Sequence, residues 1–140
     1  MHDNSAGLLL GELGRMAIEN VRVSEKARQQ LITLKRKTGI RNWNTLCRWG
    51  LCASLAEQSI PPETKIPADS SVEMTWRTFG GEYADVYLAL IRQRCQADGL
   101  GTDDEVVAAQ FRLHLHRGIA NLAGDRTLRS IQDLISRALV

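Results

Sequence analysis

Two of the three histidines in this chain, His114 and His116, are separated by a single residue, and H-x-H pairs often bind metals. The apolar spacing of Val107, Phe111 and Leu115 predicts a helix here. In a helix, two residues of separation turn the side chain by about 200°, so the two imidazoles point to nearly opposite sides. A helical chelate needs a spacing of three or four residues. We therefore predict no metal site, but one packed, hydrogen-bonded histidine and one on a polar face or interface.

The other reactive residue types give no recognisable catalytic pattern. Cys47, Cys52 and Cys95 are odd in number, lack C-x-x-C spacing and lie in apolar helical surroundings, so we expect buried thiols. Gly80-Gly81 lacks the flanking glycines and lysine of nucleotide-binding loops and is typical of a turn. We expect no catalytic residue and no cofactor, although an enzyme acting on DNA remains the last of the alternatives.

Positive charge is concentrated in the first third of the chain. Between residues 22 and 48 there are eight Lys or Arg against one acid, although the net charge of the whole chain is only +2. This asymmetry indicates a polyanionic partner, with a solvated basic helix face as the alternative. The candidate DNA-binding residues are Arg22, Lys26, Arg28, Lys35, Arg36, Lys37 and Arg41.

The N-terminal half predicts one strand and two helices. Residues 18–23 alternate as in a short strand, with Val21 and Val23 on one face and Asn20 and Arg22 on the other. A helix over 25–38 follows, between a serine cap and a glycine stop, and a second runs from residue 42 or 44 to about 57.

The C-terminal half predicts three further helices after a linker. Residues 58–70 hold all three prolines, and 72–76 alternate as a strand or extended segment that runs on to about residue 81. Helices are expected over about 83–98 and 103–123. The last is expected to be capped by Asp125 and to turn these residues inward: Leu128, Ile131, Leu134, Ile135 and Leu139.

The strand, basic helix and second helix resemble a ribbon-helix-helix unit. The resemblance rests on Val21-Arg22-Val23-Ser24, Thr38-Gly39 and the stretch from Asn42 to Leu51. It implies that strands of two chains pair and enter the major groove, with Asn20 and Arg22 contacting bases, and that the second helix offers its N-terminal N–H groups to phosphate. A transcription regulator that reads a specific operator is therefore one alternative function.

Three later motifs resemble the DndE family of bacterial DNA phosphorothioation systems. They are WRTFGGEY at 76–83, IRQRCQADG at 91–99 and FRLHLHRGI at 111–119, in this order. The resemblance, over about residues 18–124, implies a small oligomeric DNA-binding component that prefers nicked duplex. It also implies that the sulfur chemistry belongs to other proteins of the system.

These observations predict a mainly α protein with about five helices and one or two short strands. We expect residues 1–15 to form an arm, with Met16 as a possible alternative start, and 16–140 to form a single DndE-type domain. Within it, 16–57 is the ribbon-helix-helix-like part, 58–70 the linker and 71–140 the helical part. No apolar run is long enough to cross a membrane, so we expect a cytoplasmic protein.

The predicted function is non-catalytic binding of duplex DNA, nicked in preference to intact, within a DNA sulfur-modification complex. The outward valine strand and the apolar face of the 103–123 helix favour a homo-oligomer, a tetramer rather than a dimer. Another alternative is a purely structural subunit whose basic face meets acidic protein partners.

Overall fold

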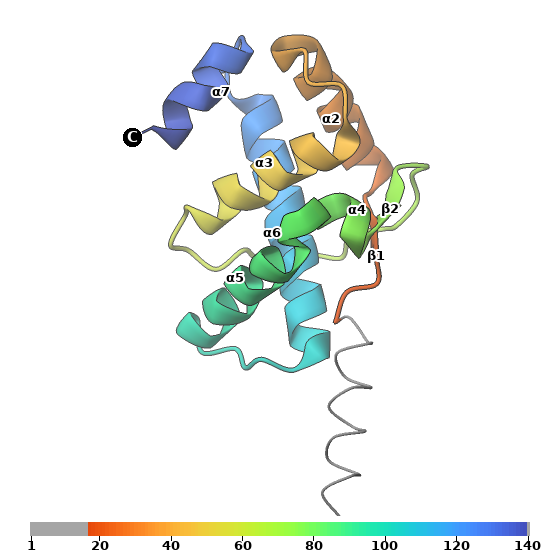
Figure 1. Ribbon diagram of the computed structural model, residues 1–140, viewed down its shortest axis with the longest axis vertical. Helices are drawn as coiled ribbons and strands as arrows, with labels where there is room; N and C mark the ends of the chain where they lie inside the picture. The colour runs from red at the N-terminus through yellow and green to blue at the C-terminus, as the bar shows by residue number, and fades with distance from the viewer. Residues whose placement is uncertain (1–16, 140) are drawn as a thin grey trace, which may run out of the picture.

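The computed structural model describes residues 17–139, so the expected arm and the two candidate starts lie outside the described residues. Helices dominate this part of the chain, and a small sheet lies at one side of them (Figure 1). The elements are β1 (Asn20–Arg22), α2 (Glu25–Thr38), α3 (Trp43–Leu55), β2 (Glu73–Thr75), α4 (Trp76–Gly80), the 3₁₀ turn η1 (Gly81–Tyr83), α5 (Ala84–Ala97), α6 (Asp104–Gly124) and α7 (Ile131–Ala138).

The mainly α fold class is confirmed, and α2 has the predicted bounds. Ser24 caps α2 by accepting a 3.1 Å hydrogen bond from the Ala27 N–H. Gly39 ends the helix with φ 75°, in the left-handed region that glycine adopts without strain. One expectation was wrong: residues 76–80 form the short helix α4 instead of continuing the strand. The reason is local, because the Thr75 hydroxyl accepts the Thr78 N–H at 3.1 Å and starts a helix there.

The strand β1 pairs antiparallel with β2 of the same chain, with Val21 opposite Met74. The valines expected to face outward are instead in the core, since Val21 and Val23 are 2% and 0% exposed. The prediction of an outward valine strand that recruits a second chain was therefore wrong. The sequence alternation was read correctly, but the apolar face of β1 is covered by the chain's own helices.

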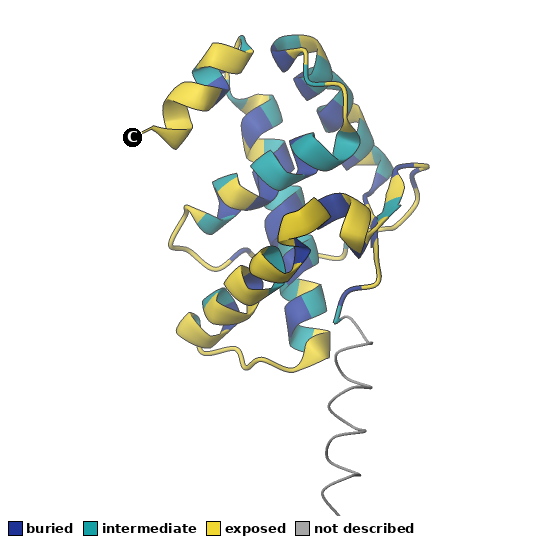
Figure 2. Ribbon diagram, viewed as in Figure 1, coloured by how far each residue is buried: buried dark blue, intermediate teal, exposed yellow. Residues whose placement is uncertain are grey.

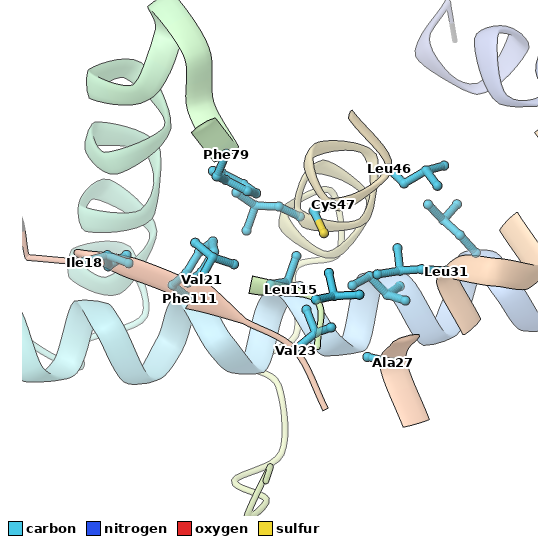
Figure 3. Close-up of a cluster of buried hydrophobic side chains, with 14 of the residues drawn as sticks. Ile18, Val21, Val23, Ala27, Leu31, Leu46, Cys47, Phe79, Phe111 and Leu115 are labelled. Atoms are coloured by element: carbon cyan, nitrogen blue, oxygen red, sulfur yellow. The ribbon is translucent and has the colours of Figure 1, made fainter. Parts of the chain in front are cut away.

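The long helix α6 forms the centre of the molecule and packs against α2, α3 and α5 (Figure 1). Its predicted apolar face is fully buried, as Figure 2 shows in dark blue. Figure 3 shows Phe111 and Leu115 of α6 within one cluster that also receives Val21, Leu31 and Phe79 from other elements. The single core explains why residues from Ile18 to Leu134 fold as one unit.

Helices α3 and α6 approach each other closely, with glycine facing glycine. A Cβ built on Gly118 of α6 would lie 1.6 Å from the backbone oxygen of Gly50 of α3, and one on Gly50 would lie 2.8 Å from Ile119 Cγ1. Glycine costs about 1 kcal/mol relative to alanine in a helix interior. Because neither glycine has a side chain, the backbones of the two helices can contact each other directly at these positions.

Three arginines hold the proline-containing segment between α3 and β2 against the helices. Arg94 donates to the carbonyls of Leu55 and Ser59 at 2.9 and 3.0 Å. Arg112 donates to the carbonyl of Ile66 at 3.2 Å, and Arg117 donates to the Ser59 hydroxyl at 3.1 Å. These arginines serve the fold, because their donors are directed at backbone and hydroxyl oxygens of the chain itself.

The last helix differs from expectation at both its cap and its faces. Ser130 caps α7 through a capping box with Asp133, whereas Asp125 accepts from Thr127 and pairs with Arg137 at 2.6 Å. Leu128 and Leu134 are buried as predicted. The other three residues expected inward are exposed: Ile131 at 38%, Ile135 at 46% and Leu139 at 81%.

Candidate nucleic-acid interface

The turn between α2 and α3 brings part of the predicted basic set together. The Gly39 N–H donates to the Lys35 carbonyl at 2.8 Å, and the Thr38 hydroxyl accepts the Ile40 N–H at 3.2 Å. This turn places the end of α2 next to the start of α3. Lys35, Arg36 and Arg41 therefore gather at one end of the helix pair, and Arg36 and Arg41 are exposed. We call these three residues the turn cluster.

Lys35 is positioned by an aromatic ring. Its Nζ lies 4.0 Å from the centroid of the Trp43 ring, in a cation–π contact across the turn. The ring restrains the long side chain and holds its Nζ at the turn. Sequence reasoning missed this role of Trp43, because the pairing depends on how the Gly39 turn brings the two helices together.

The N-terminus of α3 adds a second source of positive potential. Asn42 occupies the cap position, but its side chain makes no capping hydrogen bond to the described residues. The first N–H groups of α3 are thus available to a ligand, and the helix dipole adds partial positive charge. A hollow of about 270 Å³ lies beside them, and its lining includes Arg41, Asn44, Thr78 and one acidic residue, Glu73.

The remaining predicted residues are divided between other places. The rotation of about 100° per residue puts Lys26 and Lys37 on one flank of α2, and Arg28 and Lys35 on the other. Lys37 Nζ donates to the carbonyls of Ala123 and Asp125 at 3.1 and 3.3 Å, which places the ammonium at the negative end of α6.

At the other end of α2, three of the predicted residues lie apart from the turn cluster. Arg28 pairs with Glu25 at 2.9 Å, and Arg22 Nε donates to the Ser70 carbonyl at 2.9 Å. That bond directs the Arg22 side chain along its own chain and does not favour base reading. Lys26 is exposed and borders a cavity of about 440 Å³ next to the proline-containing segment.

The two histidines of the H-x-H pair bind different partners. His114 is 1% exposed, and its Nδ1 lies 2.8 Å from the Ser54 hydroxyl. Burial, with the charges of Arg117 and Arg94, lowers the pKa of His114 to about 4. His116 Nδ1 lies 2.8 Å from the Arg112 carbonyl, and its Nε2 accepts the Ser24 N–H at 3.2 Å. His114 is thus the packed, hydrogen-bonded histidine that we predicted.

The cysteines differ in exposure. Cys47 and Cys95 are buried as predicted, but Cys52 is exposed, so that part of the prediction was wrong. The reason is that Cys52 lies on the side of α3 that faces away from α6. Burial raises the pKa of all three thiols, that of Cys47 to about 12, which disfavours the reactive thiolate.

Two further properties concern metals and membranes. Among residues 17–139, no group of three or more His, Cys, Asp or Glu side chains lies close enough together to hold a metal ion. Within the same residues, none of the helices combines the length and the apolar character needed to span a bilayer.

The geometry defines a small helical protein with cationic side chains beside a helix N-terminus, and comparison with known proteins gives its class. The family model of "DNA sulphur modification protein DndE" matches residues 20–130. The chain therefore belongs to the DndE family, a component of DNA phosphorothioation.

A solved structure has a similar fold. The crystal structure of DndE from Escherichia coli B7A, involved in DNA phosphorothioation modification, matches with a TM-score of 0.63 and 20% sequence identity. The match covers 77% of this chain and 99% of that one. No curated protein sequence matches this chain significantly.

Proposed function

We propose that this protein is a non-catalytic, DNA-binding component of a phosphorothioation system and that it holds duplex DNA by the sugar-phosphate backbone. The observation that carries the proposal is the turn cluster beside the uncapped N-terminus of α3. Cations and free N–H groups converge there, and both bind phosphate oxygens without reading sequence. Lys26 and Arg28 extend the positive field along α2, and Arg22 and Lys37 add charge from positions engaged by backbone carbonyls.

A non-catalytic role is supported by the chemistry of the described residues. The thiols have raised pKa values, and His114 is buried against Ser54 and away from solvent. Three arginines of α5 and α6, Arg94, Arg112 and Arg117, are occupied by carbonyls, hydroxyls and carboxylates of the chain. The sulfur chemistry then belongs to other proteins of the system, which are the expected partners.

We further propose that the protein prefers nicked to intact duplex and that it assembles into a homo-oligomer, with a tetramer favoured. Apolar side chains of η1 and α5 support self-association: Tyr83, Val86 and Leu90 are 58%, 53% and 44% exposed. Several copies would multiply the phosphate contacts of one turn cluster. Sedimentation equilibrium of the pure protein measures the number of chains directly.

The test compares two triple variants with the same loss of charge. In the first, Lys35, Arg36 and Arg41 are replaced by Ala. In the control, three exposed cations elsewhere are replaced by Ala: Lys65, Arg92 and Arg129. Titration of intact and nicked duplexes of one sequence should show a loss of at least tenfold in affinity for the first variant and a much smaller loss for the control. Equal losses would mean that net charge, and not this site, attracts DNA.

A further inference from the structure

An apolar groove runs along the first half of α6, on the side facing the proline-containing segment. Its volume is about 530 Å³, and its lining includes Ile60, Ile66, Leu100, Val106, Gln110 and Leu113. Ile60 and Leu100 are 45% and 37% exposed. A cavity of about 150 Å³ accommodates benzene, so this groove has room for about three groups of that size.

One polar atom in the groove wall points to the kind of group that fits. The Gln110 side-chain oxygen is buried and has no hydrogen-bond partner among the described residues. Buried amide oxygens are nearly always paired, because an unpaired one loses its hydration without compensation. Because Gln110 lines the groove, a rotation of its side-chain amide would expose this oxygen there, where the N–H of a bound peptide backbone could pair with it.

The chain itself contains such a segment next to the groove. Residues 8–13 (LLLGEL) carry four leucines and lie a few positions before the first described residue. Ala17 packs against the core, and Ile18 belongs to the same buried cluster as Phe111 of α6. The Arg112 guanidinium of α6 binds the Arg22 carbonyl of β1, so the described chain begins near the helix that lines the groove.

The distances allow the segment to reach it. Arg112 links the two sides, because it donates to the Arg22 carbonyl of β1 at 2.6 Å and to the Ile66 carbonyl of the groove wall at 3.2 Å. Leu13 and Leu8 are four and nine residues from Ala17, a reach of up to about 13 and 30 Å. A helix with its side chains is about 10 Å across, so the reach of about 30 Å to Leu8 is sufficient to pass around α6.

We propose that residues 8–13 of the same chain bind in this groove, with leucine side chains against Ile60 and Leu100 and a backbone N–H on the Gln110 oxygen. The segment precedes the residues matched by the family model, which begin at 20. Bound in this way, the segment shields apolar surface of the groove that would otherwise face water.

The test is photo-crosslinking in the full-length protein with p-benzoylphenylalanine in place of Leu9. The labelled chain is mixed with an isotopically heavy copy, so that peptide mapping distinguishes crosslinks within one chain from those between chains. We expect crosslinks within one chain, to peptides containing residues 60–66 or 100–113. Crosslinks between chains would assign the groove to a second copy and overturn the proposal, as would crosslinks to other regions or none.

A matched pair of exposed leucines provides the control. Leu100 borders the groove, whereas Leu90 lies on α5 and is not part of the groove lining. Leu100→Glu places a charge at the apolar contact and should lower the crosslinking yield by on the order of tenfold. Leu90→Glu should leave the yield unchanged. Equal yields in the two variants would show that the groove does not bind the segment.

Discussion

Replacing Gly118 by Ala should separate the two central helices. The new methyl carbon would lie 1.6 Å from the Gly50 oxygen, short by 1.4 Å of the 3.0 Å below which such contacts essentially do not occur. The atom in the way is backbone, so no side-chain rotation can relieve the clash. Helix α3 must therefore move away from α6, and the buried contacts around Gly118 must loosen with it.

The cost can be bracketed from related cases. Overpacking a core by single methylene groups costs about 1–3 kcal/mol where side chains can adjust. Because a helix must shift here, we expect about 3 kcal/mol or more, partly offset by the better helix propensity of Ala, worth about 1 kcal/mol. For a domain of this size, the remaining loss of about 2 kcal/mol or more lowers Tm by roughly 8 °C or more.

Gly124→Ala is the matched control. It makes the same substitution in the same helix, but a Cβ there meets no atom within 4 Å, and Gly124 is not among the positive-φ glycines. Urea and thermal unfolding, followed by circular dichroism, should show Gly118→Ala strongly destabilised and Gly124→Ala unchanged or slightly stabilised. A Gly118→Ala protein within 0.5 kcal/mol of wild type, on the order of an ordinary surface change, would refute direct backbone contact.

Three further predictions concern stability. Because the pKa of His114 is about 4 in the folded protein and 6.5 in the unfolded chain, the unfolded state binds the proton first as pH falls. The His114 contribution is complete above pH 6.5 and should decline by about 3 kcal/mol toward pH 4; urea unfolding over this range tests it, and a His114→Gln variant with the same pH slope would contradict it. Lys37→Ala removes two hydrogen bonds to the end of α6 and should lower the free energy of unfolding in urea by about 1 kcal/mol. A loss close to zero, as for an ordinary surface substitution, would contradict this role of Lys37. Ser130→Ala removes the capping box of α7 and should cost about 1 kcal/mol of local stability, seen as faster amide exchange in α7 only; uniform or unchanged exchange would speak against it.

Local signals in the sequence were sufficient for much of the fold. The serine and glycine that flank α2 fix its ends through hydrogen bonds within four residues, and the apolar face of α6 repeats over about four turns. Such features depend on neighbours in sequence, so they can be predicted from one chain. The pairing of strand β1 could not be predicted in this way. Its alternation was evident in the sequence, but its partner, β2, lies about fifty residues away.

The candidate site was predictable in composition but not in arrangement. The excess of cations in residues 22–48 indicated a polyanion partner, yet the sequence could not show that Lys37 is directed at α6 and Lys35 at Trp43. The rotation of about 100° per helical residue is enough to predict that Lys26 and Arg28 lie on opposite flanks of α2. Likewise, Gly50 of α3 and Gly118 of α6 are visible in the sequence, but that these two glycines meet depends on the tertiary packing.

The central claim is that the turn cluster and the start of α3 contact DNA phosphates, and the salt dependence of binding tests it most directly. Each phosphate contact contributes about −0.9 to the slope of log K against log salt concentration. Replacing Lys35, Arg36 and Arg41 by Ala should therefore flatten the slope by about 2.7 per bound chain, measured by fluorescence anisotropy on a nicked duplex. An unchanged slope, with binding retained at moderate salt, would contradict the claim.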